Sequence, residues 1–477
     1  DSEIKRAQQF GLAGYPVFTR KQNTDLSYLV CANKLINADH IYCQFATHNA
    51  HTMLAIAHIA DNQPSFEFQR LHGMGESLFH WLHESGYNLP VRVYAPVGSY
   101  RELLPYLVRR LLENGANSSF INRIWDEKIP ALEVVADPVT FVEQLEQKAH
   151  HKIPLPEAIY GQQRKNSVGL NLSDQEVLIT TQQQMREALQ PHYTVAPCGE
   201  LTDREDSLAI YNPANDQQQL GIQQLADKQQ LQHALQQAVD YQPNWANLAV
   251  TERAAILQKV AMLLEQHQVE LLALITAEAG RILADGVSEV REAVDFCRYY
   301  AQQAISQLAQ AIPLPGPVGE ENQLHWAARG VFVTISPWNF PVAIFTGQIA
   351  AALAAGNCVL AKPAHQTSIL AQLVVKLFHQ AGVPTQALQL LPCSGRLISQ
   401  TLLPDSRVAG VAFTGSTETA RQINQTLAQR DGPIASFIAE TGGQNVMIAD
   451  SSALPEQLVD DVIRSAFLSA GHFSKSG

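Results

Sequence analysis

Short β-rich runs alternate with helix-like segments in two separate stretches of this chain, and this alternation limits the folds that it can adopt. In the first stretch the β-rich runs are residues 16–19, 41–48, 66–72, 91–95 and 118–124. The helix-like segments between them are residues 24–37, 50–61, 74–86 and 99–113. This spacing indicates βα units around a parallel sheet and matches the rhythm of a β/α barrel.

The number of strands in the first stretch limits that prediction. Five strands cannot close an eight-stranded barrel. An open parallel sheet would expose an unpaired edge. Two arrangements remain open: a doubly wound open sheet, or a barrel whose other strands precede residue 1.

The second α/β stretch begins near Ala209. Residues 217–240 are rich in glutamine, but their apolar residues recur at helical spacing and predict a helix rather than a prion-like tract. Further helices are expected over residues 251–266, 269–279 and 287–308. Strands are then expected at residues 330–336, 357–361, 408–414 and 434–439, alternating with helices at residues 343–355, 367–381 and 417–429. This order is typical of a doubly wound nucleotide-binding sheet.

Composition excludes several classes of protein. The chain is 46% hydrophobic and 16% charged, which favours packed domains over disorder. Its 33 Lys and Arg against 45 Asp and Glu give a net charge of −12, so no nucleic-acid partner is expected. Six cysteines without a CxxC spacing exclude a disulfide scaffold and a thiolate zinc site, and no metal site is expected. No apolar run of membrane-spanning length and no signal peptide is found, which favours a cytoplasmic protein.

Polar and aromatic residues follow the predicted strands of the first stretch, at the edge where barrel enzymes bind their ligands. On the helix 99–113, Glu113 lies four residues after Arg109 and three after Arg110, so it can pair with either. Spacing alone leaves two interpretations: a solvated ion-pair face, or an arginine fork for a substrate carboxylate. His48 taken alone is more often a satisfied histidine than a catalyst.

Five strings in residues 1–127 resemble proline dehydrogenase. They are residues 14–21, 44–49, 71–76, 94–98 and 107–120. The resemblance implies the C-terminal part of an FAD-binding β/α barrel that oxidises proline. It implies that Arg109 and Arg110 bind the proline carboxylate and that Glu113 orients them. The implied proline-ring contacts are Tyr94 and Leu71, and the implied FAD contacts are Thr19, Lys21, Thr47, His48, Asn49 and Phe120.

Four motifs follow strand ends in the second stretch, although no GxGxxG fingerprint occurs. The amide of Asn339 can donate to a developing oxyanion, or it belongs to an ordinary turn. Lys362 either reaches a ribose or phosphate or is a solvated lysine. Gly415 and Ser416 precede a helix N-terminus, which favours a pyrophosphate. Glu440 stands beside two glycines, where a carboxylate can act as a general base.

In this order the motifs resemble an aldehyde dehydrogenase over about residues 201–471. The string 440–445 is similar to the glutamate-semialdehyde (pyrroline-5-carboxylate) dehydrogenase branch. The resemblance implies that a cysteine thiolate attacks the aldehyde, Asn339 helps to hold the oxyanion, hydride passes to NAD and Glu440 activates water. The implied NAD contacts are Trp338, Lys362, Gly415 and Ser416.

Two positions depart from the aldehyde dehydrogenase pattern. His365 stands where the family usually has a glutamate. Ser474 occupies the place of the nucleophilic cysteine, and none of the six cysteines lies near it. Because a serine hydroxyl is far less nucleophilic than a thiolate, we expect the chain to bind NAD and to turn over neither substrate.

Together the two resemblances point to the bifunctional proline utilization A family, truncated at both ends. The expected domains are a barrel part (residues 1–127), a linker (128–200), an NAD-binding domain (201–440) and the start of a catalytic domain (441–477). The resemblance implies proline and glutamate semialdehyde as substrates, a quinone electron acceptor, a homo-oligomer and peripheral contact with the inner face of a membrane. The alternatives are a catalytically inactive protein that binds nucleotide or dimerises, and a stand-alone aldehyde dehydrogenase.

Overall fold

A computed structural model describes residues 2–61, 66–115, 123, 128–190, 192–199, 207–467 and 469. The chain forms two compact units. One unit contains Asp1–Ile4 and Tyr15–Pro154, and the other contains Lys5–Gly14 and Leu155–Gly477. Within the described residues, every helix is too short or too polar to cross a membrane.

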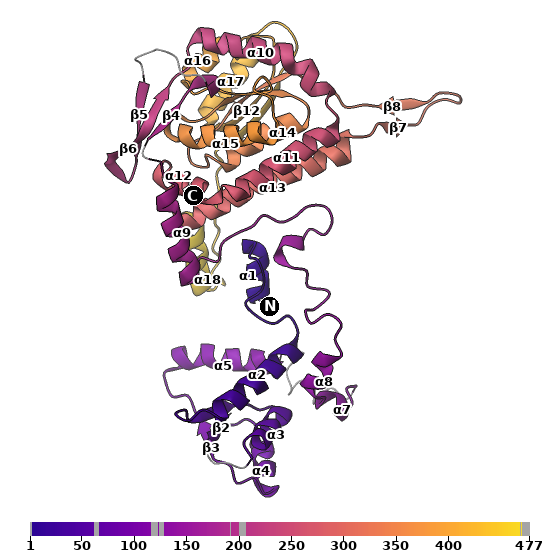
Figure 1. The fold of residues 1–477 in the computed structure, drawn as a ribbon, viewed down its shortest axis with the longest axis vertical. Coiled ribbons are helices and arrows are strands. Elements are labelled where there is room, and N and C mark those ends of the chain that lie inside the picture. Colours follow the sequence, from indigo (N-terminus) through magenta and orange to yellow (C-terminus); the bar gives the residue numbers. More distant parts are fainter. Residues whose placement is uncertain are drawn as a thin grey trace. The chain divides into compact units, whose positions relative to one another are not determined.

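The first unit is built on a parallel three-stranded sheet in the order β1-β2-β3 (Figure 1). The strands are β1 (Cys43–Ala46), β2 (Phe66–Leu71) and β3 (Val91–Tyr94). The helices are α2 (Lys21–Ile36), α3 (Ala50–Ile59), α4 (Glu76–Glu84), α5 (Tyr100–Gly115), α7 (Ala131–Val134) and α8 (Pro138–Glu143). One face of the sheet buries Phe45, Phe66 and Phe68, whose rings meet edge to face.

The other face of this sheet is polar, because side chains alternate along a strand. Glu67 accepts hydrogen bonds from Gln44 (3.2 Å) on β1, from Gln69 (3.0 Å) and from the guanidinium of Arg92 (2.6 Å) on β3. The hydrogen bonds from Arg92 and Gln69 lower the pKa of Glu67 to about 2. The carboxylate therefore joins all three strands.

The strand expected at residues 16–19 does not form, and that prediction is wrong. This segment makes hydrogen bonds to residues 148–154 instead of to a neighbouring strand. Tyr15 donates to the Pro154 carbonyl, and the Thr19 hydroxyl accepts from the His150 N–H at 2.9 Å. The strand expected at residues 118–124 lies outside the described residues apart from residue 123, which is helical.

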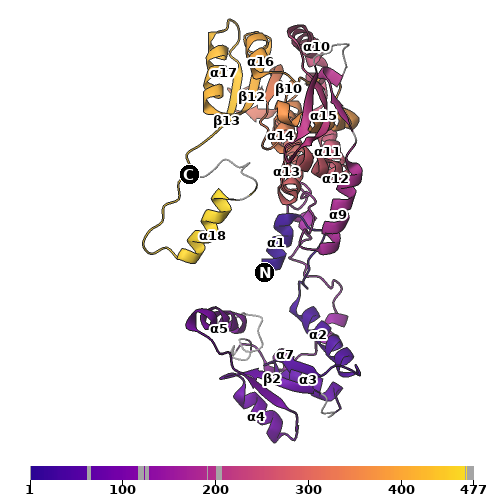
Figure 2. The ribbon, with the colours of Figure 1, turned by 90° about the vertical axis from the view of Figure 1, so that its left-hand side faces the viewer.

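The second unit contains a five-stranded parallel sheet in the order β11-β10-β9-β12-β13 (Figure 2). Its strands are β9 (Val331–Ile335), β10 (Cys358–Lys362), β11 (Leu388–Leu390), β12 (Val408–Gly415) and β13 (Ser436–Thr441). β9, β10 and β11 are nearly continuous apolar runs, as strands that are buried on both faces require. The chain order reverses between β9 and β12, so the doubly wound prediction is confirmed.

Helices surround this sheet, and α11 and α13 lie side by side (Figure 1). The long helices are α9 (Gln175–Ala188), α10 (Lys228–Asn247), α11 (Val250–Gln266), α12 (Gln268–Ala277), α13 (Leu283–Leu308), α14 (Ala343–Ala354), α15 (Ser368–Ala381), α17 (Thr417–Gln429) and α18 (Pro455–Ala466). The shorter ones are α16 (Gly395–Thr401), η1 (Pro156–Ala158), η2 (Pro197–Gly199) and η3 (His365–Thr367).

The helix expected over residues 217–240 begins later than predicted. β6 (Asn215–Gln224) is the middle strand of a sheet with β4 (Tyr193–Val195) and β5 (Ser207–Asn212). Helix α10 starts only at Lys228, after a capping box formed by Asp227 and Gln230. Pairing with two other strands therefore overrides the helical spacing of the apolar residues. The region 128–200 also contains α9 and β4, so it is more structured than a simple connector.

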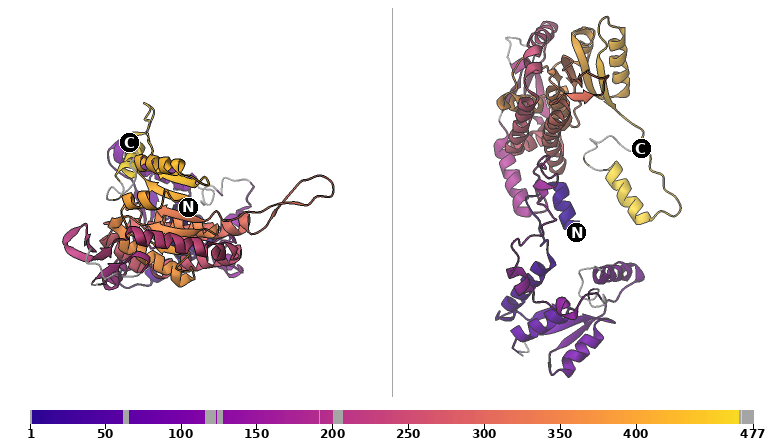
Figure 3. Two further views of the ribbon diagram at one scale, coloured as in Figure 1. Left: turned by 90° about the horizontal axis from the view of Figure 1, so that it is seen from above. Right: turned by 90° about the vertical axis from the view of Figure 1, so that its right-hand side faces the viewer.

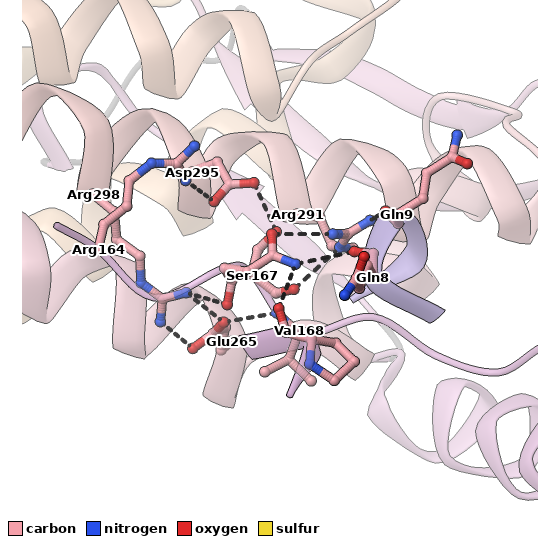
Figure 4. A network of polar contacts seen from close by, with 11 residues as sticks. Gln8, Gln9, Arg164, Ser167, Val168, Glu265, Arg291, Asp295 and Arg298 are labelled. Atoms are coloured by element: carbon pink, nitrogen blue, oxygen red, sulfur yellow. Dashed lines mark hydrogen bonds and ion pairs between the residues drawn. The ribbon is translucent and has the colours of Figure 1, made fainter. Parts of the chain in front are cut away.

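Residues 5–14, which include most of α1 (Ser2–Phe10), are held in the second unit by a polar network (Figure 4). Arg291 on α13 donates to the carbonyls of Gln9 (2.8 Å) and Ser167 (3.3 Å). The Gly169 N–H donates to the Gly11 carbonyl at 2.9 Å. Elsewhere in this unit, β7 (Ile312–Leu314) and β8 (Asn322–Leu324) form a hairpin that extends away from the other elements (Figure 3).

Candidate active site

A cleft of about 1070 Å³ lies at the carboxyl ends of β9, β12 and β13. This position is the switch point of the sheet, where open α/β sheets bind their ligands. Five predicted site residues line the cleft together. They are Trp338, Asn339, Gly415, Ser416 and Glu440.

Gln348 on α14 joins the strand ends beneath this cleft. Its side-chain amide donates to the Thr414 hydroxyl on β12 at 3.1 Å and accepts from the Ser336 hydroxyl after β9 at 2.8 Å. The side chain thereby fixes the separation of the two loops that carry the candidate residues. Gln348 was absent from the predicted site, although an amide within the apolar run of α14 is a signal that the sequence contains.

The turn from β12 into α17 forms one wall of the cleft. Ser416 is the N-cap, and its hydroxyl accepts from the Thr419 N–H at 3.2 Å. A Cβ at Gly415 would lie 2.6 Å from the Phe413 ring, so a larger residue at this position would have to displace that buried ring. The N-terminus of α17 carries partial positive charge and suits an anion.

Glu440 lies opposite Thr414 in the register of β12 and β13. It is exposed and lines the cleft, so a water molecule can reach its carboxylate. Asn339 lies across the cleft, on the loop that follows β9. The structure thus places an amide donor and a carboxylate in one cleft, as an oxyanion donor and a general base require.

Lys362 is not among the residues that line the cleft. It is 8% exposed, and its ammonium donates to the Pro363 carbonyl at 2.6 Å. Burial lowers the pKa of Lys362. Ribose binding by Lys362 stays a prediction, and it would require this side chain to reorient. Ser474 lies outside the described residues.

The first unit has a smaller cleft of about 290 Å³ at the carboxyl ends of its strands. It brings together five predicted residues. They are Thr47, His48, Leu71, Tyr94 and Arg110. The His48 ring accepts from the Leu71 N–H at 3.3 Å, and burial, with a smaller effect of the charge on Arg70, lowers the pKa of His48.

Other predicted residues of the first unit lie elsewhere. Lys21 and Asn49 line a separate cavity of about 130 Å³, where Lys21 pairs with Asp25 at 2.6 Å. Thr19 accepts the His150 N–H, and Arg109 is exposed on α5 outside the lining of the 290 Å³ cleft. Phe120 and the side chain of Glu113 lie outside the described residues.

Comparison with known proteins identifies the family of the second unit. The model of the aldehyde dehydrogenase family matches residues 201–475. The chain belongs to the aldehyde dehydrogenase family. A second family model, that of proline dehydrogenase, matches residues 1–123, so the aldehyde dehydrogenase segment follows a proline dehydrogenase segment in one chain.

Relatives of this aldehyde dehydrogenase chain share the same two-part arrangement. The bifunctional protein PutA of Salmonella typhimurium is 47% identical over 489 residues, which cover 99% of this chain and 36% of that protein. A proline utilization A variant from Bradyrhizobium japonicum, solved as a crystal structure, is 45% identical with a TM-score of 0.88. That match covers 99% of this chain and 45% of the other. The chain therefore spans 36% and 45% of the lengths of these two relatives.

A relative of the second unit alone is the 1-pyrroline-5-carboxylate dehydrogenase of Bacillus subtilis. It is 31% identical over 289 residues, which cover 60% of this chain and 56% of that protein. The predicted resemblance to the proline utilization A family, and to its pyrroline-5-carboxylate dehydrogenase branch, is confirmed.

Proposed function

We propose that this chain belongs to a bifunctional enzyme that oxidises proline with FAD and then glutamate semialdehyde with NAD, and that this chain alone turns over neither substrate. In this proposal the described second unit supplies the NAD site of the second oxidation. The observation that carries it is the single cleft that gathers Asn339, Gly415, Ser416 and Glu440 from three strand ends. The relatives named as bifunctional PutA or as pyrroline-5-carboxylate dehydrogenases support the choice of substrate.

The residues of the larger cleft fit NAD. Its volume of about 1070 Å³ slightly exceeds the range of ordinary ligand sites, about 300–1,000 Å³, and leaves room for a dinucleotide. The capped N-terminus of α17 would receive the pyrophosphate, and Trp338 offers an aromatic wall. Bound NAD would supply the hydride acceptor. Asn339 would donate to the substrate oxygen, and Glu440 would take a proton from water.

The described residues of the smaller cleft fit only part of an FAD site. Its volume of about 290 Å³ is below the range of ordinary ligand sites, so it cannot enclose a dinucleotide. We propose that Thr47, His48, Leu71, Tyr94 and Arg110 form one wall of the flavin and proline site.

Several finer statements belong to the same proposal. Ser474, at the position of the nucleophile, leaves this chain able to bind NAD but unable to oxidise the aldehyde. The protein is cytoplasmic, forms a homo-oligomer and passes electrons to a quinone. A nucleotide-binding protein without catalysis is the second candidate, favoured by the absence of a cysteine at position 474.

Calorimetric titration of the purified chain with NAD tests the proposal. We expect saturable binding that Ser416→Ala weakens, because the cap orients the α17 N-terminus. Ser394→Ala is the matched control, since Ser394 caps α16 in the same way, accepting from Leu397 at 3.2 Å. Absence of NAD binding would overturn the proposed cofactor site. Formation of NADH from glutamate semialdehyde would overturn the proposed lack of turnover.

A further inference from the structure

The ion pair of Arg281 and Glu289 is almost fully buried in the second unit. Arg281 is 2% exposed and Glu289 is 1% exposed, and the guanidinium and carboxylate lie 3.3 Å apart. Arg281 follows Gly280, whose φ of +67° turns the chain just before α13, and Glu289 lies on α13 itself. A buried ion pair contributes little net stability because both charges lose their hydration. Its presence here therefore calls for a reason other than stability.

Both members of the pair hold the turn that carries Asn339. The Arg281 guanidinium donates to the Asn339 carbonyl and lies 4.3 Å from the centre of the Phe340 ring. The Glu289 carboxylate accepts from the N–H of Val342 at 2.7 Å and of Ala343 at 3.3 Å. Arg281 thus fixes the start of the turn and Glu289 fixes its end.

This arrangement bears directly on the cleft. Asn339 lines the cleft, while its carbonyl is held by the buried Arg281. Holding the Asn339 carbonyl at one end of the turn and the N–H groups of Val342 and Ala343 at the other restricts the backbone from which the Asn339 side chain projects. An oxyanion donor works by being oriented before the charge develops, and charge-assisted hydrogen bonds hold such a donor more firmly than neutral ones.

We propose that the buried Arg281–Glu289 pair is a positioning device that orients Asn339 as the oxyanion donor. The inference rests on the proposed aldehyde oxidation. Asp285 also approaches Arg281, at 3.9 Å, so Arg281 keeps one anionic neighbour when Glu289 is neutralised. Replacing Glu289 by glutamine should therefore disturb the turn less than replacing Arg281 by methionine.

Trp338 is a reporter of this turn, because it precedes Asn339 and lines the same cleft. The chain contains five tryptophans, so fluorine NMR of the chain labelled with fluorotryptophan gives a separable set of lines. Trp338→Phe assigns the first reporter line and Trp245→Phe assigns a second one. We expect Arg281→Met to shift or broaden the Trp338 line and to leave the line of the buried Trp245 in place. Arg281→Lys, which keeps the charge, should restore the wild-type Trp338 line in part.

Arg253 provides a matched control. It is also buried, at 5% exposed, and donates to the carbonyls of Ala246 (3.1 Å) and Ala354 (3.2 Å), with a longer contact to that of Trp245 (3.5 Å). Arg253→Met should lower the melting temperature and perturb the Trp245 line without moving the Trp338 line. An unchanged Trp338 line in Arg281→Met, or an equal change in both variants, would refute the inference.

Two further outcomes are informative. If Arg281→Met does not fold, Glu289→Gln and Arg281→Lys decide, since each must still move the Trp338 line. Failure of the wild-type chain to bind NAD would refute the proposed function, whereas the response of the Trp338 line tests the positioning contact independently.

Discussion

Gln348 donates to the hydroxyl of Thr414 at 3.1 Å and so connects α14 with the carboxyl end of β12. The same side chain accepts from Ser336 beyond β9. These two strand ends flank the switch point of the sheet. The spacing of the cleft walls therefore depends on one amide.

Gln348→Leu should lower both NAD affinity and stability. Leaving Ser336 and Thr414 without this partner costs about 1–3 kcal/mol of unfolding free energy. We expect NAD affinity to fall several-fold, measured by calorimetric titration. Gln372→Leu is the control, because Gln372 on α15 likewise bridges to a strand, donating to the Thr194 carbonyl at 2.7 Å. Gln372→Leu should lose stability and keep its affinity for NAD. Equal losses of NAD affinity in both variants would show that Gln348 does not set the spacing of the cleft walls.

Glu278 predicts a pH dependence of stability. Its carboxylate is buried and accepts from the N–H of Ile369 (2.8 Å) and Leu370 (2.9 Å), and burial raises its pKa from 4.5 to about 8. A carboxyl with a raised folded pKa binds its proton more tightly in the folded state. Its contribution to the free energy of unfolding is therefore complete below pH 4.5 and is lost as the pH rises to about 8. The free energy of unfolding falls by about 1.4 kcal/mol per pH unit at most.

Denaturant unfolding at several pH values checks this expectation. The wild-type chain should lose stability between about pH 5 and about pH 8. Glu278→Gln should flatten that slope, and the variant of the exposed Glu252, Glu252→Gln, should not. A wild-type stability that does not decrease over this interval would contradict the raised pKa.

The elements that the sequence predicts well are those with one strong local signal. Residues 330–336 and 357–361 are continuous apolar runs bounded by glycine or asparagine, and buried parallel strands form there. Residues 217–224 contain Leu220 and Ile222, which fit a strand as well as a helix. Only pairing with β4 and β5 decides between the two, and a single sequence does not show that pairing.

The candidate site shows the same division. Motifs at strand ends predict that Asn339, Gly415 and Glu440 meet, because the carboxyl ends of parallel strands share one edge. The direction of a long side chain is decided by its surroundings in the fold. Lys362 is therefore found bonded to a neighbouring carbonyl rather than in the cleft, and the contact of Arg281 with Asn339 has no local signal.

Glu67 predicts acid sensitivity of the first unit. Hydrogen bonds from Arg92 and Gln69 lower its pKa to about 2, so its contribution to stability is present above 4.5 and is lost as the pH falls toward 2. Acid unfolding followed by the fluorine NMR line of Trp81, assigned with Trp81→Phe, should show this loss, since the chain contains five tryptophans. Glu67→Gln should remove it, whereas Glu84→Gln, at an exposed helical position, should leave the acid transition unchanged. Identical transitions in all three proteins would contradict the role of Glu67.

At Gly11 we expect a single added methyl group, as in Gly11→Ala, to detach residues 5–14 from the rest of the second unit. Its φ is +61°, and a Cβ there would lie 2.2 Å from the Ser167 carbonyl oxygen and 2.8 Å from the guanidinium of Arg291. Backbone atoms cannot move aside cheaply, so Gly11→Ala should lower the unfolding free energy by about 1–3 kcal/mol. Gly14→Ala is the matched control, because nothing lies within 4 Å of its Cβ position.

Limited proteolysis reports the detachment directly. Gly11→Ala should expose residues 5–14 to cleavage several times faster than in the wild-type chain, while Gly14→Ala should be cleaved at the wild-type rate. Arg291→Met should resemble Gly11→Ala, because Arg291 holds the Gln9 and Ser167 carbonyls in the same network. Equal cleavage rates for the two glycine variants would mean that the close approach at Gly11 does not anchor this segment.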